Sequence, residues 1–167
     1  VPSMSRTSRG RALANVLTMQ DGERLMAVLP VSQFEEKYVF FATEKGVVKK
    51  TPLAAFSNPR PSGILALTID LDDSLVKVAL TSGDDEIVLA THDGMACRFN
   101  ETDVRPMGRT ARGVRGITLD GSDSVIDMVV IRPGMSVLTV CENGYGKRTL
   151  IDEYRKTKRG GKGVINI

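Results

Sequence analysis

Several residue types that build common functional sites are scarce in this sequence. It has no Trp, three Tyr and five Phe, so aromatic platforms for stacking single-stranded bases are few. His92 is the single histidine, which excludes a His-rich metal centre, and we expect no metal site. A Ser/His/Asp triad would have to use this same residue, which stands next to a turn, so we expect no catalytic residues. The two cysteines, Cys97 and Cys141, lie in apolar stretches and are expected to be reduced core thiols.

Long apolar runs and a large net charge are missing as well. No run of about 18 apolar residues exists to cross a membrane, and residues 1–6 lack the apolar segment of a signal peptide. We therefore expect a cytoplasmic protein without a membrane partner. The 23 Lys and Arg against 20 Asp and Glu leave a charge of only +3. Any attraction to a polyanion must then come from where the charges are placed.

A repeat of about 50 residues organises the chain. Three segments align without gaps around a turn glycine, at Gly46, Gly94 and Gly144. Asp93-Gly94 and Asn143-Gly144 are typical of two-residue hairpin turns of type I′, in which both residues need positive φ. Each segment is therefore predicted to be a β-hairpin.

Further features keep the phase of the hairpins. A base stands four residues after each turn glycine (Lys50, Arg98, Arg148), and a large apolar residue stands ten after it (Phe56, Val104, Tyr154). A second glycine series follows at Gly63, Gly113 and Gly163, with a truncated earlier copy at Gly10. These glycines open the apolar runs 64–69, 114–119, 164–167 and 11–17. An acidic turn, 70–73 or 120–123, and a further strand, 75–80 or 125–131, complete a unit of four short strands.

Regular short strands at this period indicate an all-β, propeller-like array of four-stranded antiparallel blades, about three to four in number. Residues 1–34 are predicted to end a preceding blade, 35–84 and 85–134 to form one blade each, and 135–167 to form an incomplete one. Helix is restricted to single turns at 53–56 and 151–154. The alternative is an all-β sandwich whose segments resemble one another by chance.

Bases and acids occupy different parts of the unit. Residues 67–87 contain six acids and one base, whereas 98–115 contain five Arg and two acids, and 155–162 contain five bases and no acid. Because antiparallel strands alternate in direction, we expect the acidic turns and the basic loops at opposite ends of the blades. A single basic loop is usually only a solvated surface.

The bases also recur in phase. Four residues and one residue before the second glycine stand Arg6 and Arg9, then Arg109 and Arg112, then Arg159 and Lys162, whereas Arg60 is offset in the remaining copy. Such a line of cations matches a phosphate backbone, so we predict binding to duplex DNA with little sequence preference. The candidate DNA-binding residues are Arg6, Arg9, Lys49, Lys50, Arg60, Arg98, Arg105, Arg109, Arg112, Arg115, Lys147, Arg148, Lys158, Arg159 and Lys162.

Four phrases give the chain a resemblance to a known family. They are Ser5 to Gly10, Val47 to Thr51, Phe99 to Ile117 and Asn143 to Thr149. These phrases resemble the carboxy-terminal domains of bacterial DNA gyrase A subunits. The resemblance implies a β-pinwheel domain of about six blades, of which residues 1–167 are a fragment that holds roughly half. In such a domain hairpin blades exchange strands and DNA wraps round a basic perimeter, so that the ATP-driven enzyme introduces negative supercoils. The alternatives are the equivalent domain of the related topoisomerase IV and a propeller-like protein-interaction scaffold.

A glycine-rich stretch resembles the signature box of that family, which reads Gln, base, Arg, Gly, Gly, base, Gly. The stretch comprises Thr157, Lys158, Arg159, Gly160, Gly161, Lys162 and Gly163. Six of the seven positions match, but Thr157 replaces the Gln, and the copy stands in a late blade instead of the first. Its spacing excludes a nucleotide-binding P-loop, because a Gly follows Lys162 where Ser or Thr is required.

The resemblance also implies what the chain does not carry. We expect it to be non-catalytic by itself and to hold no cofactor, because the catalytic tyrosine and the ATP and Mg²⁺ sites belong to other domains. Its implied partners are double-stranded DNA, the remainder of the gyrase A subunit, and the gyrase B subunit in an A2B2 holoenzyme.

Overall fold

Short antiparallel strands make up nearly all of the regular structure. The computed structural model describes the whole chain except residues 1–4, 11–16, 18 and 61. One sheet has the order β3-β1-β2-β6 and a second has the order β10-β5-β4-β7, while β8 and β9 form a two-stranded hairpin. The strands are β1 (Tyr38–Thr43), β2 (Val47–Pro52), β3 (Leu75–Thr81), β4 (Glu86–Thr91), β5 (Met95–Asn100), β6 (Val114–Arg115), β7 (Val125–Ile131), β8 (Ser136–Val140), β9 (Gly146–Leu150) and β10 (Val164–Ile165). The all-β prediction is confirmed.

The fourth strand of each sheet comes from the following repeat unit. β6, which follows the β4-β5 hairpin in sequence, pairs with β2 of the preceding hairpin, and β10 pairs with β5 in the same way. The repeat analysis, which gave each unit four strands of its own, was therefore wrong, whereas the exchange of strands that the family resemblance implies is confirmed. The apolar run 64–69 forms no strand. The runs that begin at 114 and 164 form strands of only two residues each, β6 and β10, which pair with the hairpin of the preceding unit. The earlier run, 11–17, lies almost entirely outside the described residues.

The hairpins turn through three residues instead of two. In each loop the glycine N–H donates to the carbonyl three residues earlier: Gly46 to Thr43 (3.0 Å), Gly94 to Thr91 (3.1 Å) and Gly144 to Cys141 (2.9 Å). Positive φ falls on the glycine of each turn, and among the described non-glycine residues only Glu36 has it. The type I′ prediction was wrong. In a type I turn followed by a left-handed glycine, only the glycine needs positive φ, so Asp93 and Asn143 keep ordinary negative φ.

A single turn of 3-10 helix follows each hairpin. The predicted turns at 53–56 and 151–154 are confirmed as η2 (Leu53–Phe56) and η4 (Ile151–Glu153). The equivalent η3 (Glu101–Asp103) was missed, because its sequence is polar. Asn100 caps it by accepting a hydrogen bond from the Thr102 N–H at 2.8 Å.

The hydrophobic core runs continuously between neighbouring sheets. Phe40 of β1, Val48 of β2, Ile87 of β4, Phe99 of β5 and Met128 of β7 are all at most 1% exposed and form one cluster. Cys97 belongs to that cluster, whereas Cys141 is half-buried, and both are free thiols. Because the cluster draws on two sheets, neither sheet buries its apolar face without the other.

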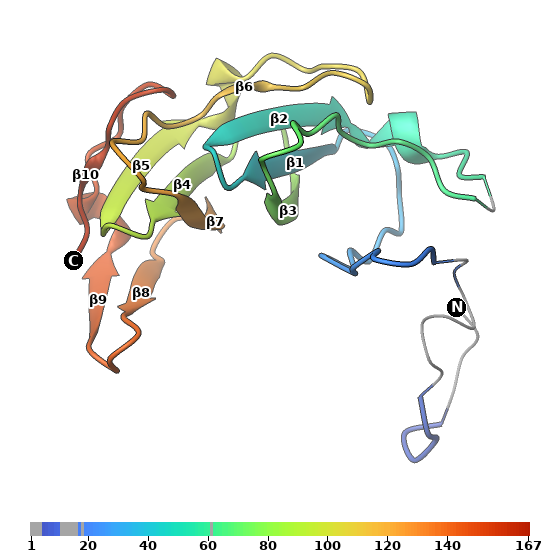
Figure 1. Cartoon of the computed structure of the whole chain (residues 1–167), viewed down its shortest axis with the longest axis horizontal. Coiled ribbons are helices and arrows are strands. Elements are labelled where there is room, and N and C mark those ends of the chain that lie inside the picture. The colour runs from blue at the N-terminus through green and yellow to red at the C-terminus, as the bar shows by residue number, and fades with distance from the viewer. Residues whose placement is uncertain (1–4, 11–16, 18, 61) are drawn as a thin grey trace.

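The sheets follow one another round an arc (Figure 1). β3 and β7 lie on its inner side. The loops that follow the 3-10 turns, residues 57–60, 104–112 and 154–162, are called the outer loops here and run along the outer side. The described part of the chain contains no helix with the length and hydropathy that a membrane crossing requires.

Two loop glycines give a matched test of strand donation. Both Gly63 and Gly113 have positive φ, but only Gly113 lies against another unit, where an added Cβ would stand 2.6 Å from the Val48 carbonyl oxygen. An added Cβ at Gly63 meets nothing within 4 Å. Gly63→Ala should cost about 1–2 kcal/mol of unfolding free energy from backbone strain alone. Gly113→Ala should cost clearly more in urea denaturation, and equal losses would show that β6 does not pack on β2.

Candidate nucleic-acid interface

The predicted DNA-binding cations fall into three structural groups. Some are buried between repeat units, some are paired with carboxylates, and the rest are exposed, part of them on the outer loops. Some of these contacts follow the repeat, because the Arg112–Asp70 ion pair recurs 50 residues later as Lys162–Asp120.

The base four residues after each hairpin glycine clamps the next unit. Lys50 Nζ donates to the carbonyl of Glu101, the first residue of η3, at 2.9 Å. Arg98 Nη1 donates to the carbonyl of Ile151, the first residue of η4, at 2.6 Å, and to that of Tyr154 at 3.0 Å. A cation that satisfies carbonyls at the end of a neighbouring hairpin holds two units in register. Arg148, the third base of this series, is exposed.

Glu101 completes the clamp made by Lys50. Its side chain is fully buried and accepts hydrogen bonds at 2.8 Å from the Thr81 hydroxyl and from the N–H groups of Gly83 and Asp85. The Lys50 ammonium lies 3.7 Å from the same carboxylate. A buried carboxylate needs this many donors, because each unmet lone pair would be desolvated without compensation.

Lys49 is also withdrawn from the surface. It is fully buried, its Nζ donates to the carbonyls of Ala66 (2.7 Å) and Arg109, and it lies 5.7 Å from the centroid of the Phe41 ring. Burial lowers the pKa of the Lys49 ammonium. The structure therefore gives Lys49, Lys50 and Arg98 structural contacts between units, and the interface proposed below omits them.

The cation one residue before the loop glycine pairs with an acid. Arg112 Nη1 lies 2.9 Å from Asp70, and Lys162 Nζ lies 2.7 Å from Asp120. The expected separation of acidic turns from basic loops was wrong at these positions. The segments that cross between units bring them together, as the Thr68 hydroxyl donates to the Thr110 carbonyl (2.9 Å) and Thr118 to that of Gly160 (2.7 Å). Both ion pairs are largely exposed, so each is worth only about 0–1 kcal/mol and a phosphate can compete for the cation.

The cations four residues before the loop glycine differ from each other. Arg159 donates from Nε to the Asp103 carbonyl (2.9 Å) and from Nη1 to the Arg115 carbonyl (3.1 Å), so it braces the preceding unit. Arg109 lines a groove of about 470 Å³ together with Arg60, Asn58 and Thr110. Two neighbouring outer loops thus place guanidinium groups on one groove.

The box-like stretch is mostly a packing element. The Thr157 N–H donates to the Arg98 carbonyl at 2.8 Å, and the Gly160 N–H donates to the Gly116 carbonyl at 2.6 Å. Gly163 has positive φ and lies so close to Ala96 that a Cβ would overlap the Ala96 backbone. Lys158 and Lys162 are the exposed cations of this stretch.

Sequence reasoning missed one in-phase pair. Arg105 and Arg155 stand eight residues before Gly113 and Gly163, and both are exposed at the start of an outer loop. Neither side chain has a hydrogen-bond or ion-pair partner in the described structure. Extending the phase search past four residues would have found this pair, since only Arg105 was among the candidates. Arg6, Arg9, Arg60, Arg115, Lys147 and Arg148 are likewise exposed.

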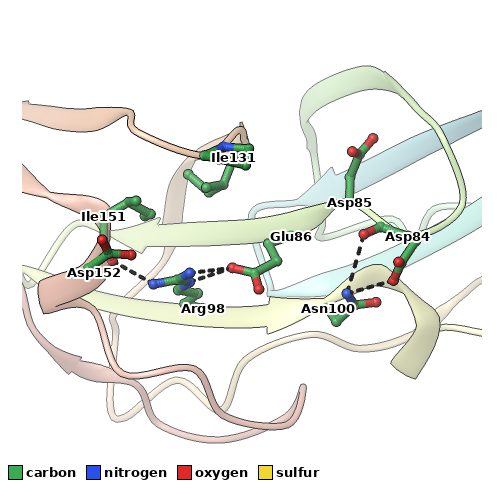
Figure 2. A pocket seen from close by; sticks show the side chains of 9 residues that line it. Asp84, Asp85, Glu86, Arg98, Asn100, Ile131, Ile151 and Asp152 are labelled. Carbon is green, nitrogen blue, oxygen red and sulfur yellow. Dashed lines mark hydrogen bonds and ion pairs between the residues drawn. The ribbon is translucent and has the colours of Figure 1, made fainter.

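Carboxylates gather in a separate pocket of about 390 Å³ (Figure 2). Asp84, Asp85, Glu86 and Asp152 line it around Arg98, whose Nε donates to Glu86 at 2.6 Å. Burial raises the pKa of Glu86, but hydrogen bonds from Lys156 and Arg98 outweigh it and hold the pKa below its usual range. Glu86 is therefore ionised near neutral pH, where it pairs with Arg98 and Lys156. With Asp84, Asp85 and Asp152, the pocket has more acidic than basic side chains. Within the described residues, neither these carboxylates nor any other three His, Cys, Asp or Glu side chains are arranged so that they could hold a metal ion.

Comparisons with known proteins identify relatives over the full chain. The family model described as DNA gyrase C-terminal domain, beta-propeller, matches residues 1–32, 37–82, 85–132 and 136–167. The DNA gyrase A subunit of Salmonella typhimurium is 49% identical over 168 residues, which cover 100% of this chain and 19% of that protein. The DNA gyrase A subunit of Haloquadratum walsbyi is 45% identical over 174 residues, which cover 100% of this chain and 20% of that protein. The chain thus spans about a fifth of the length of these relatives.

One solved structure shares both the fold and recognisable sequence. The C-terminal domain of DNA topoisomerase IV superposes with a TM-score of 0.91 at 30% identity, over 99% of this chain and 52% of that one.

Arg98 and Arg148 give a matched test of the clamp between units. Arg98→Ala removes the donor to two carbonyls and the partner of Glu86, so the unfolding free energy should fall by about 1.5–3 kcal/mol. Arg148→Ala, at the same place in the repeat but exposed, should change it by less than about 0.5 kcal/mol. Urea denaturation followed by circular dichroism measures both. Equal effects would refute the clamp.

Proposed function

The chain belongs to the DNA gyrase C-terminal domain family, and from this premise we propose that it binds and wraps duplex DNA along its outer loops. The observation that carries the proposal is the recurrence of exposed, unpartnered arginines at Arg105 and Arg155, one repeat apart on successive outer loops. Arg109 and Lys158 lie on the same loops, and the Arg60–Arg109 groove joins two of them.

The arc of the protein supplies the curvature. Smooth bending of a 20 to 30 base-pair site costs on the order of 1–6 kcal/mol, which charge-assisted contacts to phosphates offset. Arg112 and Lys162 add to these contacts when a phosphate displaces Asp70 or Asp120. The acidic pocket around Glu86 repels the duplex and so restricts it to the outer loops.

Binding should depend little on sequence. A base-reading helix is lacking in the described structure, and the tilted Phe40–Phe99 pair lies in the core instead of on a DNA-facing surface. The cations therefore contact the phosphate backbone of the DNA, whose charge is the same for every base sequence.

By analogy with its relatives, the chain acts as a non-catalytic part of the gyrase A subunit. In this proposal the remainder of that polypeptide, together with the gyrase B subunit, forms the A2B2 holoenzyme, which uses ATP and Mg²⁺ for strand passage. The wrapped duplex would present a crossing of one sense, so that negative supercoils are introduced. The second candidate function is the same DNA-binding role in a topoisomerase IV instead of a gyrase. It is favoured by the TM-score of 0.91 to the C-terminal domain of that enzyme.

Removing the two in-phase arginines tests the proposal directly. Arg105→Ala/Arg155→Ala should weaken binding to all duplex sequences alike and lower the slope of log K against log salt by about 2, one per lost phosphate contact. Arg132→Ala, which removes an exposed arginine outside the outer loops, is the control and should change neither quantity. Fluorescence anisotropy at several salt concentrations gives both values.

A propeller-like protein-interaction scaffold predicts a different result. Such a protein would show negligible duplex binding even at about 50 mM salt, where an electrostatic binder holds DNA. That outcome, or equal affinity of the double variant and the wild type, would overturn the proposal.

Removing the competing carboxylates should have the opposite effect. Asp70→Asn/Asp120→Asn frees Arg112 and Lys162 from exposed ion pairs worth about 0–1 kcal/mol each, so duplex affinity should rise about two- to fivefold. Asp152→Asn, in the acidic pocket, serves as the control for the general loss of negative charge. An equal gain in the control would show that Arg112 and Lys162 do not contact DNA.

A further inference from the structure

The groove that holds Arg60 and Arg109 has walls from two consecutive units. Residues between 58 and 65, which follow η2, form the first wall, and Arg109 and Thr110, on the outer loop that follows η3, form the second. The two walls are more than forty residues apart in sequence, so contacts beneath the surface must set the distance between them. One such contact is the hydrogen bond from the Thr68 hydroxyl to the Thr110 carbonyl at 2.9 Å.

The buried Lys49 ammonium bonds to the backbone of both walls. Its Nζ donates to the carbonyl of Ala66, just after the first wall, at 2.7 Å, and to the carbonyl of Arg109 itself. Lys49 belongs to β2 and is fully buried, so its ammonium reaches the walls from inside the protein. A single side chain thus links the backbones of the two segments that carry Arg60 and Arg109.

The next unit has no cation at this place in its hairpin. Cys97 faces Leu89 across the β4-β5 hairpin, as Lys49 faces Phe41 across the β1-β2 hairpin. Cys97 is fully buried as well. The same place in the sheet is therefore filled once by a base and once by a thiol, which means that the fold does not require a base there.

The outer loops of the two junctions are held in different ways. At the second junction the Gly160 N–H donates to the Gly116 carbonyl at 2.6 Å, and Gly160 has positive φ. Thr110 and Ala66 stand fifty residues earlier, at the same places in the repeat, but Thr110 does not have positive φ. The Ala66 carbonyl accepts its hydrogen bond from Lys49 instead. The ammonium therefore replaces a backbone contact between the loops.

Burial of this charge is not explained by stability alone. None of the ion pairs among the described residues includes Lys49, so its charge is compensated by two carbonyls and by the Phe41 ring, whose centroid lies 5.7 Å from Nζ. Replacing a buried charge by an apolar side chain of similar volume is often neutral or stabilising. The link between the two walls is what an apolar side chain could not supply.

We propose that Lys49 is a positioning residue for DNA: it fixes the two walls so that the guanidinium groups of Arg60 and Arg109 face one phosphate of the duplex. Lys49 does not contact the DNA, because it is fully buried. Two guanidinium groups on one phosphate form charge-assisted hydrogen bonds whose strength depends on their geometry, and hence on the distance between the walls. This role rests on the proposed function, because the groove belongs to the surface that binds DNA there.

Lys49→Met tests this role, since it keeps the length of the side chain and removes the donors. The variant should bind duplex DNA more weakly and lower the slope of log K against log salt by about 1–2, as if phosphate contacts were lost. Lys45→Met, at the exposed tip of the same hairpin, removes the same charge and should leave the slope unchanged. Fluorescence anisotropy gives the slopes, and circular dichroism verifies the fold. An unchanged slope in a folded Lys49→Met protein would overturn the proposal.

A double-variant cycle shows whether Lys49 acts through the groove. Added to Arg60→Ala/Arg109→Ala, Lys49→Met should cause no further loss of duplex affinity, because the groups that it positions are already gone. Added to Arg155→Ala, which changes a different outer loop, it should cause its full loss. Equal further losses in both backgrounds would indicate general structural damage and would refute a positioning role.

Lys49→Cys provides a second variant in case methionine disturbs the fold. Cysteine fills the same place in the next unit, so this variant should fold and show the same loss of slope. If neither variant folds, Lys49 is required for the fold itself and the proposal is wrong.

The fate of the proposed function can be told apart from that of Lys49. A wild type that does not bind duplex DNA at about 50 mM salt would refute both. Weaker binding by Arg105→Ala/Arg155→Ala, together with unchanged binding by the Lys49 variants, would refute the role of Lys49 alone.

Discussion

The architecture depends on one constraint: the β1-β2 and β4-β5 hairpins complete their sheets with a strand from another unit. β2 and β5 receive their last partners from the unit that follows, through β6 and β10. Two kinds of residue where neighbouring units meet, glycines and basic side chains, make this exchange possible. Gly113 and Gly163 let the donated strand approach the acceptor backbone, and Lys50 and Arg98 clamp the following 3-10 turn. Stability is therefore shared between neighbours, as in other repeat proteins.

The same constraint decides which cations remain for a polyanion. A base next to the hairpin is drawn into the junction, since carbonyls at the end of the neighbouring hairpin need a donor. A base at the end of an outer loop meets the acidic turn of the preceding unit, as Arg112 and Lys162 do. Bases near the start or middle of the outer loops, such as Arg105 and Lys158, point their charge toward solvent. A basic side chain thus becomes a structural or a surface cation according to the contacts that the neighbouring unit offers it.

Sequence reasoning recovered the periodic part of the fold and missed what depends on neighbours. The hairpins, the glycine series and two of three 3-10 turns follow from local chemistry, and the family follows from specific phrases. The exchange of β6 could not be read from the residues, because Val114 and Arg115 look the same whether they pair within a unit or across units. Lys49 gave no sign of burial, since its carbonyl acceptors Ala66 and Arg109 are remote in sequence.

Strand donation also has a consequence in time. During synthesis, β2 emerges from the ribosome about sixty residues before β6, so the first sheet must wait with an open edge while the whole second hairpin is made. That edge carries Lys49 and Lys50, whose charges disfavour pairing with a strand of another protein. The charges remain exposed until the carbonyls of Arg109 and Glu101, which accept their hydrogen bonds, have been synthesised. The two lysines would thus protect the nascent chain from aggregation and later stabilise the contact between units in the folded chain.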